Sequence, residues 1–120
     1  MSPQSPIFNR TYDLLRWLVP ATVRFPRAQR FVMAEQLQVC AFEFQRELFD
    51  AAASDRPLNH LRRADASLNR LRMNLRLSHE LSLLSVGQYS HVSKIADELG
   101  RLLGGWSRAV KRNDGVSDIS

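Results

Sequence analysis

The sequence predicts an all-α protein that folds as an antiparallel up-and-down four-helix bundle, in one domain over residues 1–120. Apolar residues recur three and four positions apart along four segments, no segment shows the alternation of a β-strand, and the connections are short. A length of 120 residues suits a single domain. We expect helices at about residues 7–24, 27–53, 57–83 and 86–112, and a flexible polar tail at 113–120.

The expected first helix, residues 7–24, places apolar residues at helical spacing and then meets a proline. Its apolar members are Leu14, Leu15, Trp17, Leu18 and Val19. Pro20 has no backbone N–H to donate, so we expect the helix to bend there. Phe25 precedes Pro26, and a residue before proline is driven out of the helical region. Phe25 should therefore mark the turn into the second helix.

The expected second helix, residues 27–53, has the clearest apolar stripe. The stripe consists of Ala34, Leu37, Ala41, Phe44, Leu48 and Ala51. Its spacing holds one face toward the bundle axis. Phe31, Phe42 and Phe49 lie outside the stripe, and they either widen the core or contact another subunit. The broad apolar faces of antiparallel bundles favour the core.

The third and fourth helices have recognisable starts. Ser54 or Asp55 should cap the third helix, with Pro57 in its first turn. Ser85 and Gln88 form a capping-box pair at the start of the fourth. The third stripe is Leu58, Leu61, Ala64, Leu68, Leu71 and Leu75. The fourth is Val92, Ile95, Leu99, Leu102, Trp106 and Ala109.

The fourth stripe keeps its period through three glycines, Gly100, Gly104 and Gly105. Each glycine costs a helix interior up to about 1 kcal/mol, so we expect another backbone to approach closely and compensate. A helix end near Gly104 is the alternative.

Charge is segregated along the chain, which has 17 basic and 12 acidic residues and a net charge of +5. The third segment sets one acid, Asp65, against Arg56, Arg62, Arg63, Arg70, Arg72 and Arg76. The fourth helix ends with Arg101, Arg108, Lys111 and Arg112. The second helix carries Glu35, Glu43, Glu47 and Asp50. Segregated charge favours a phosphate-binding face over charge that serves only solubility.

The candidate residues for binding nucleic acid come from the two basic clusters. They are Arg62, Arg63, Arg70, Arg72, Arg76, Arg101, Arg108, Lys111 and Arg112. Arg72 has an alternative role, because helical spacing brings it close to the leucine stripe, where its head group can pair with a carboxylate across a helix interface. Arg76 can share that role, within one protomer or between subunits.

Catalytic and metal-binding patterns are sparse. His60, His79 and His91 are widely spaced, so we expect no metal site, no cofactor and no enzyme activity. The separation of Arg72 and His79 nevertheless resembles the R-x4–6-H motif of HEPN ribonucleases, so a helical ribonuclease is an alternative function.

Cellular location follows from what the sequence contains. Cys40 is the only cysteine, which excludes an intrachain disulfide and suits a reducing compartment. No signal sequence and no apolar run of roughly 20 residues is visible. We therefore expect a cytoplasmic protein without membrane insertion.

Four segments together resemble one protein family. They are LLRWLVP, FPRAQRF, ADASLNRLRMNLRL and LLSVGQYSHVSKIADELGRLLGGW. Over about residues 12–111 they are similar to the accessory variability proteins (Avd) of diversity-generating retroelements. The resemblance implies a homopentameric barrel of four-helix protomers, itself no enzyme. Such an assembly binds the reverse transcriptase and RNA, or an RNA–DNA hybrid, and supports mutagenic cDNA synthesis in mutagenic retrohoming.

The resemblance also ranks the candidate residues. Arg72, Arg76 and Arg101 lie inside matching motifs, whereas Arg62, Arg63 and Arg70 are proposed on charge alone. Asn74 and Ser78 occupy positions that are often larger and apolar in such proteins. A third hypothesis is a purely structural oligomer whose basic charge is incidental.

Overall fold

The computed structural model describes the backbone of residues 5–119 and the side chains of residues 6–113. Its elements are α1 (Ser5–Val23), α2 (Arg27–Gln29), the π-helix η1 (Arg30–Ala34), α3 (Glu35–Ala53), α4 (Leu58–Glu80) and α5 (Val86–Ile119). Because α2, η1 and α3 follow one another without a break, the described chain forms four long helical segments and no strand. The predicted all-α class is confirmed.

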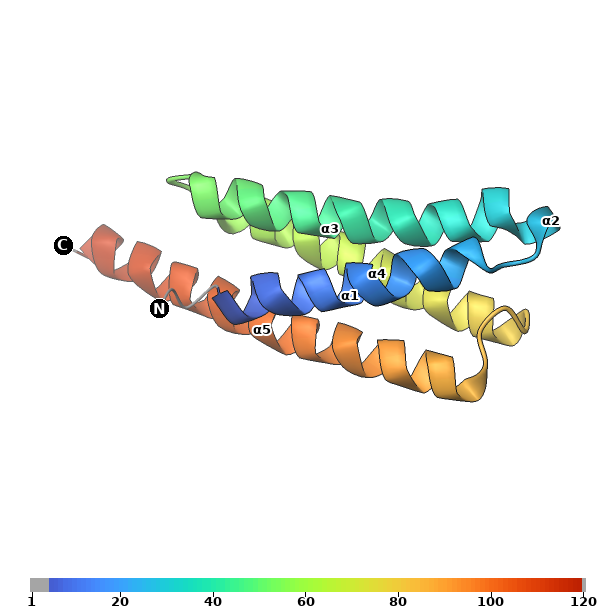
Figure 1. Ribbon diagram of the computed structural model, residues 1–120. Helices are drawn as coiled ribbons and strands as arrows, with labels where there is room; N and C mark the ends of the chain where they lie inside the picture. The colour runs from blue at the N-terminus through green and yellow to red at the C-terminus, as the bar shows by residue number, and fades with distance from the viewer. Residues whose placement is uncertain (1–4, 120) are drawn as a thin grey trace.

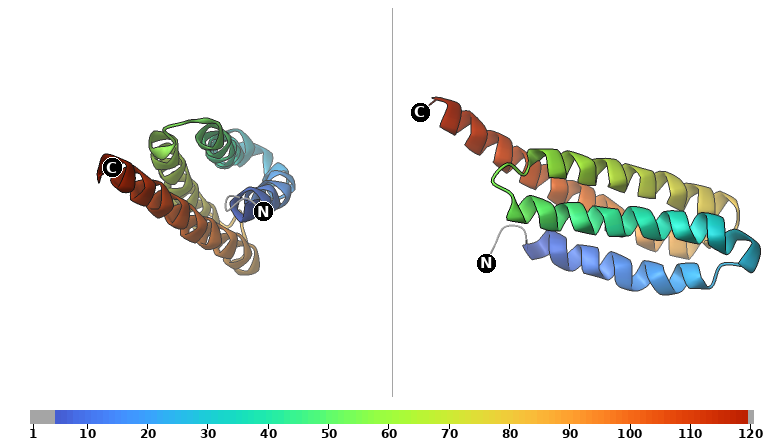
Figure 2. Two further views of the ribbon diagram at one scale, coloured as in Figure 1. Left: turned by 90° about the vertical axis from the view of Figure 1, so that its left-hand side faces the viewer. Right: turned by 90° about the horizontal axis from the view of Figure 1, so that it is seen from above.

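The four segments pack as an antiparallel up-and-down bundle (Figure 1). Each helix contacts the two beside it, α1 with α3 and α5, and α4 with α3 and α5. Figure 2 shows the helices around a common axis, with the C-terminal part of α5 extending past the end of the bundle. α5 continues to Ile119, beyond the predicted end at residue 112. The side chains of the predicted tail from residue 114 onward, and Ser120 altogether, lie outside the described residues.

The predicted stripes form the core. All six stripe residues predicted for the second helix are buried, Ala34 in η1 and the other five in α3, as are Leu61, Ala64, Leu68, Leu71 and Leu75 of α4. In α5, Val92, Ile95 and Leu99 are buried, but the next buried position is Leu103 and not Leu102, which is only partly buried against the core. Each buried leucine contributes roughly 1.5–3 kcal/mol relative to an exposed one.

The three phenylalanines outside the stripe do not widen the core, so that interpretation is wrong. Phe31, Phe42 and Phe49 are 74%, 47% and 57% exposed, whereas Phe44 is fully buried. Phe44 belongs to the buried core, whereas Phe42 and Phe49 lie on an exposed part of α3. Phe49 contacts Phe8 of α1, with ring centroids 4.8 Å apart.

The connections between helices agree with the sequence except at one cap. Phe25 is buried at the turn before Pro26, as predicted. Neither predicted residue caps α4: the Ser54 hydroxyl accepts the backbone N–H of Arg56 at 3.0 Å, and Pro57 precedes the helix without a side-chain cap. The predicted cap is therefore wrong, because the Ser54 hydroxyl is bonded within the turn, before the first residue of α4.

The turn from α4 to α5 confirms the predicted capping box. The Ser85 N–H donates to Gln88 Oε1 at 2.9 Å, and the Gln88 N–H donates to Ser85 Oγ at 3.1 Å. Before it, Ser82 adopts a left-handed backbone with φ of 64°, and the Leu83 N–H returns to the Ser78 carbonyl at 2.8 Å. α4 ends at Glu80, and Leu81 is exposed.

Two helix interiors contain residues that the sequence marked as unusual. α1 continues through Pro20 to Val23, and the bend expected there stays a prediction. α5 continues through Gly100, Gly104 and Gly105, so the alternative of a helix end near Gly104 is wrong. No helix among the described residues has the length and apolarity needed to cross a membrane.

The polar residues at the end of α4 are accommodated by hydrogen bonds. Ser78 is fully buried, and its hydroxyl donates to the Asn74 carbonyl at 2.8 Å. The Asn74 amide lies 3.8 Å from the Sγ atom of Cys40, which is buried as expected. Asn74 and Ser78 are therefore accommodated by polar contacts, where larger apolar side chains are common in such proteins.

Candidate nucleic-acid interface

Four of the nine predicted basic residues pair with carboxylates of the same chain. Arg72 Nη1 lies 2.7 Å from Asp97 Oδ1, and Arg70 Nη2 lies 3.2 Å from Glu43 Oε2. Arg76 Nε lies 3.2 Å from Glu80 Oε1, and Arg63 Nη1 lies 3.9 Å from Glu47 Oε2. Fewer cations of α4 are therefore without a carboxylate partner than the sequence predicts.

Arg72 takes the structural role that the sequence offered as its alternative. Its Nη2 also donates to the Ala96 carbonyl at 3.0 Å, so the guanidinium joins α4 to α5 through two acceptors. Gly100 makes room for it, because a Cβ atom at residue 100 would collide with Arg72 Nη2. The close approach expected over the glycines is therefore made at Gly100 by a side chain and not by another backbone.

The other predicted cations lie on α4 and α5. Within 4 Å, no carboxylate among the described side chains reaches Arg62, Arg101, Arg108, Lys111 or Arg112. Arg62, Arg108 and Lys111 come together in one groove of about 340 Å³ between α4 and α5. The groove's other lining residues are Leu58, Leu61, Asp65, Gly100, Leu103, Gly104 and Ser107. We call it the basic groove.

Glycine and leucine residues shape the basic groove. Leu61 and Leu103 are almost fully buried and belong to its lining. Gly104 presents no side chain there, and the position of a missing Cβ lies 3.3 Å from Arg108 Nη1, so Arg108 folds back toward its own helix. Several cations beside one open groove with a single acid suit a phosphate, which accepts bidentate hydrogen bonds from guanidinium.

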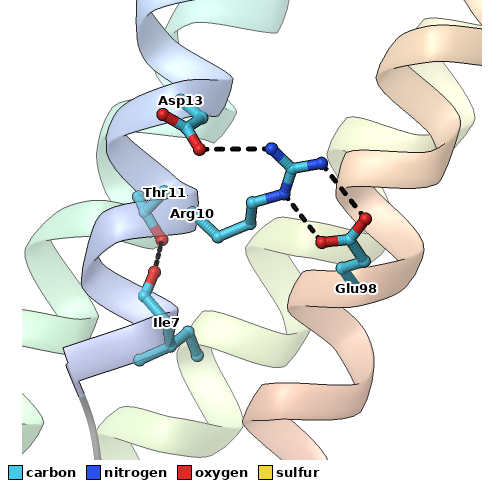
Figure 3. Close-up of polar contacts among 5 residues, drawn as sticks. All are labelled: Ile7, Arg10, Thr11, Asp13 and Glu98. Carbon is cyan, nitrogen blue, oxygen red and sulfur yellow. Dashed lines mark hydrogen bonds and ion pairs between the residues drawn. The ribbon is translucent and has the colours of Figure 1, made fainter.

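Arg101 lies apart from the basic groove, at a second groove of about 480 Å³ between α1 and α5. Arg10 spans that groove (Figure 3), donating to Glu98 from Nε at 2.8 Å and from Nη2 at 3.1 Å. Its Nη1 donates to Asp13 at 3.1 Å. The hydrogen bonds of Arg10 raise its pKa, and the bond with Glu98 has a larger effect than the bond with Asp13. No local pattern predicts this clamp, because Arg10 and Glu98 lie 88 residues apart in the chain.

Arg72 and His79, the pair that resembles a HEPN motif, have separate structural partners. Arg72 contacts Asp97 and Ala96, as described above. His79 Nδ1 lies 3.1 Å from the Leu84 carbonyl, and the ring stacks on Tyr89 with centroids 4.8 Å apart. Both side chains thus fasten α4 to the following turn and to α5.

One cluster of possible metal ligands crosses the turn between α3 and α4. Single oxygen or nitrogen atoms of Glu47, Asp50 and His60 lie within 4.8 Å of one another. His60 Nδ1 donates to Glu47 Oε2 at 2.9 Å, so this buried carboxylate has a hydrogen-bond partner within the chain. The sequence prediction of no metal site overlooked this grouping because helix pairing, and not local spacing, creates it.

A comparison with models of known protein families identifies the family of the chain. The model of the bAvd-like family matches residues 6–110, which include the stripes of all four long helical segments. The chain belongs to the bAvd-like family. The resemblance drawn from the four sequence segments is confirmed. No curated protein matches the chain.

The family match covers most of the basic groove. Arg62 and Arg108 of this bAvd-like chain lie within the matched residues, whereas Lys111 follows directly after their end at residue 110.

Three further cations lie at the connection from α1 to α3 and were not among the predicted residues. They are Arg24, Arg27 and Arg30. Their signal in the sequence is the absence of any acid between Asp13 and Glu35.

Proposed function

We propose that the chain is a non-enzymatic accessory protein of a diversity-generating retroelement. It binds the reverse transcriptase and its RNA, or an RNA–DNA hybrid, in the cytoplasm, and it supports mutagenic cDNA synthesis in mutagenic retrohoming. The membership in the bAvd-like family supports the accessory role. The basic groove, with Arg62, Arg108 and Lys111 around one opening, is the observation on which the RNA contact rests.

The basic groove suits a nucleic-acid backbone better than a single small anion. It runs along the contact of two long helices, so successive phosphates can follow its length. Neutralised phosphates release counterions, which supplies much of the affinity of proteins for nucleic acid. Arg112 adjoins the groove in sequence, and Arg101 extends the positive charge of α5 toward α1.

A second set of arginines can also contact RNA, after a change of partner. These are Arg63, Arg70 and Arg76. Each has an exposed side chain and a single carboxylate partner. Exposed ion pairs of this kind are worth about 0–1 kcal/mol, so a phosphate can replace the carboxylate at little cost. Arg72 is the exception, because its contacts with Asp97 and Ala96 join two helices, and we assign it to the protomer fold.

Assembly of several copies completes the proposal. Phe42 and Phe49 present exposed aromatic surface along α3, beside Val39, which is 42% exposed. We assign this surface to contacts between subunits of a homopentameric barrel. A ring repeats the basic groove once in each subunit, so a single RNA can contact several grooves and gain affinity through multivalency. Phe31, predicted with these two residues, lies in η1 and is not part of this surface of α3.

The test compares two triple variants of equal charge. Arg62→Gln, Arg108→Gln and Lys111→Gln together remove three charges from the groove, and Arg16→Gln, Arg46→Gln and Lys94→Gln remove three from elsewhere on the exposed surface. The anisotropy of a labelled RNA, measured over a range of salt concentrations, gives the affinity. We expect the groove variant to bind at least roughly tenfold more weakly and to lose about 2 units of salt slope.

The control variant should retain most of the affinity and slope. An equal loss in both variants would reject the basic groove as the binding surface. Binding of neither RNA nor the reverse transcriptase by the unaltered assembly would favour a purely structural oligomer.

A further inference from the structure

A second basic surface lies at the other end of the bundle. It consists of Arg24, Arg27, Arg30 and Phe31, around the connection from α1 to α3, and we call it the arginine corner. In Figure 1 this connection lies at the end where α4 turns into α5, far from the C-terminal part of α5 that carries the basic groove. The corner and the basic groove are therefore separate surfaces.

The π-helix η1 explains why an aromatic residue points outward at this corner. Continued backward by three or four residues, the apolar stripe of α3 would lead from Ala34 to Arg30 and Phe31. In the structure the buried residues of η1 are Met33 and Ala34, and Phe31 is 74% exposed. A π-turn inserts extra residues into the helical repeat and so changes which side chains face the core, and such turns are frequent at functional sites.

The corner has charge of one sign. The chain carries four arginines and no acid between Asp13 and Glu35. No carboxylate among the described side chains lies within 4 Å of Arg24, Arg27 or Arg30. Arg30 Nη2 donates to the Phe25 carbonyl at 3.4 Å, which places its guanidinium at the turn. The next acid along the chain, Glu35, lies one turn after Phe31 at the start of α3, outside the corner.

We propose that the arginine corner binds a single-stranded segment of nucleic acid, with an unpaired base stacked on Phe31 and its phosphates held by Arg27 and Arg30. An exposed aromatic face beside guanidinium groups is the combination that single-strand binding requires, because every base offers a π-face and every linkage a negative charge. The absence of acids and the breadth of the positive charge favour a polyanion over an apolar protein segment. The inference rests on the proposed function and adds to it a second, strand-selective contact.

The test uses the full chain and two RNA probes, a labelled 20-nucleotide mixed-sequence strand without self-complementarity and its blunt duplex. Phe31→Ala should weaken binding of the single strand by roughly tenfold and leave duplex binding within about twofold, since duplex bases are already stacked. Phe31→Trp should retain the affinity, and the added tryptophan emission should be quenched by the single strand but not by the duplex. Tyr12→Ala is the matched control, because Tyr12 is an aromatic residue of α1 that is 62% exposed and lies outside both basic surfaces and the surface assigned to subunit contacts.

Each outcome decides the proposal. A loss confined to Phe31→Ala and to the single strand, with unchanged assembly mass, supports it. Equal effects of Phe31→Ala and Tyr12→Ala, no effect at all, or a loss of affinity together with dissociation of the assembly overturns it. Binding that depends on the basic groove but not on Phe31 overturns this inference alone, whereas unaltered protein without RNA affinity overturns the proposed function as well.

Discussion

Arg72 of α4 crosses directly over Gly100 of α5 to reach Asp97 and the Ala96 carbonyl. The guanidinium occupies the space that any larger residue at position 100 would fill. Gly104, one turn later, faces only the flexible end of Arg108. The two glycines therefore have different roles, although the sequence presents them as equivalent interruptions of one helix.

Alanine substitutions at the two glycines should have opposite effects on stability. Gly104→Ala should raise the free energy of unfolding by up to about 1 kcal/mol through helix propensity. Gly100→Ala gains the same term but displaces Arg72 Nη2 from the Ala96 carbonyl, and this part-buried hydrogen bond from a charged group is worth about 1.5–3 kcal/mol, so we expect a net loss of about 1 kcal/mol. Urea denaturation measures both. Stabilisation by Gly100→Ala would show that Arg72 does not hold the two helices together.

Ser82 offers a stabilising change at the turn between α4 and α5. Its φ of 64° is a left-handed conformation that glycine adopts without the cost of a side chain. We expect Ser82→Gly to raise the free energy of unfolding by about 0.5–1 kcal/mol, and Ser82→Val to lower it. Thermal unfolding followed by circular dichroism checks the pair, and the reverse order would contradict the conformation of this turn.

The clamp between Arg10 and Glu98 should stabilise the contact of α1 with α5. Arg10→Gln should lower the free energy of unfolding by about 1 kcal/mol, and Arg10→Lys should recover only part of it, because lysine cannot make the bidentate contact. The raised pKa of Arg10 means that its contribution is complete below the ordinary arginine pKa and is lost only as the pH rises through the raised value. Chemical denaturation near neutral pH should therefore detect the clamp in full.

The ribonuclease alternative has a direct test at His79. We expect the purified protein to leave a labelled RNA intact, and His79→Ala to lower the free energy of unfolding by about 1 kcal/mol through loss of the stack on Tyr89. Gel analysis of the RNA and urea denaturation give the two readouts. Cleavage that His79→Ala abolishes while the fold persists would establish an enzyme instead.

The exposed phenylalanines of α3 should control assembly. Phe42→Glu and Phe49→Glu together place two carboxylates in the surface that we assign to subunit contacts, and we expect the assembly to dissociate into smaller species. Light scattering after size-exclusion chromatography measures the mass. Met73→Glu, at a residue of α4 that is 73% exposed, is the control and should leave the mass unchanged. Identical behaviour of all variants would place the interface elsewhere.

Much of the fold was predictable because it depends on local periodicity. The stripe from Ala34 to Ala51 was predicted residue by residue, and the Ser85–Gln88 capping box was predicted with both its partners. The error over Phe31 and Phe42 arose because a helical repeat gives the width of an apolar face but not the edge at which packing stops. The π-turn, in which Met33 and Ala34 are buried and Phe31 is exposed, has no simple sequence signature.

The four helices, most of the residues along their common axis and the excess of positive charge can be predicted from the amino-acid sequence. The distribution of that charge depends on helix packing: Arg72 and Arg70 meet carboxylates brought close by that packing, whereas Arg62, Arg108 and Lys111 meet in a groove. Helix formation and apolar burial follow from neighbours along the chain. Ion pairing depends on which side chains from distant segments come within about 4 Å of each other.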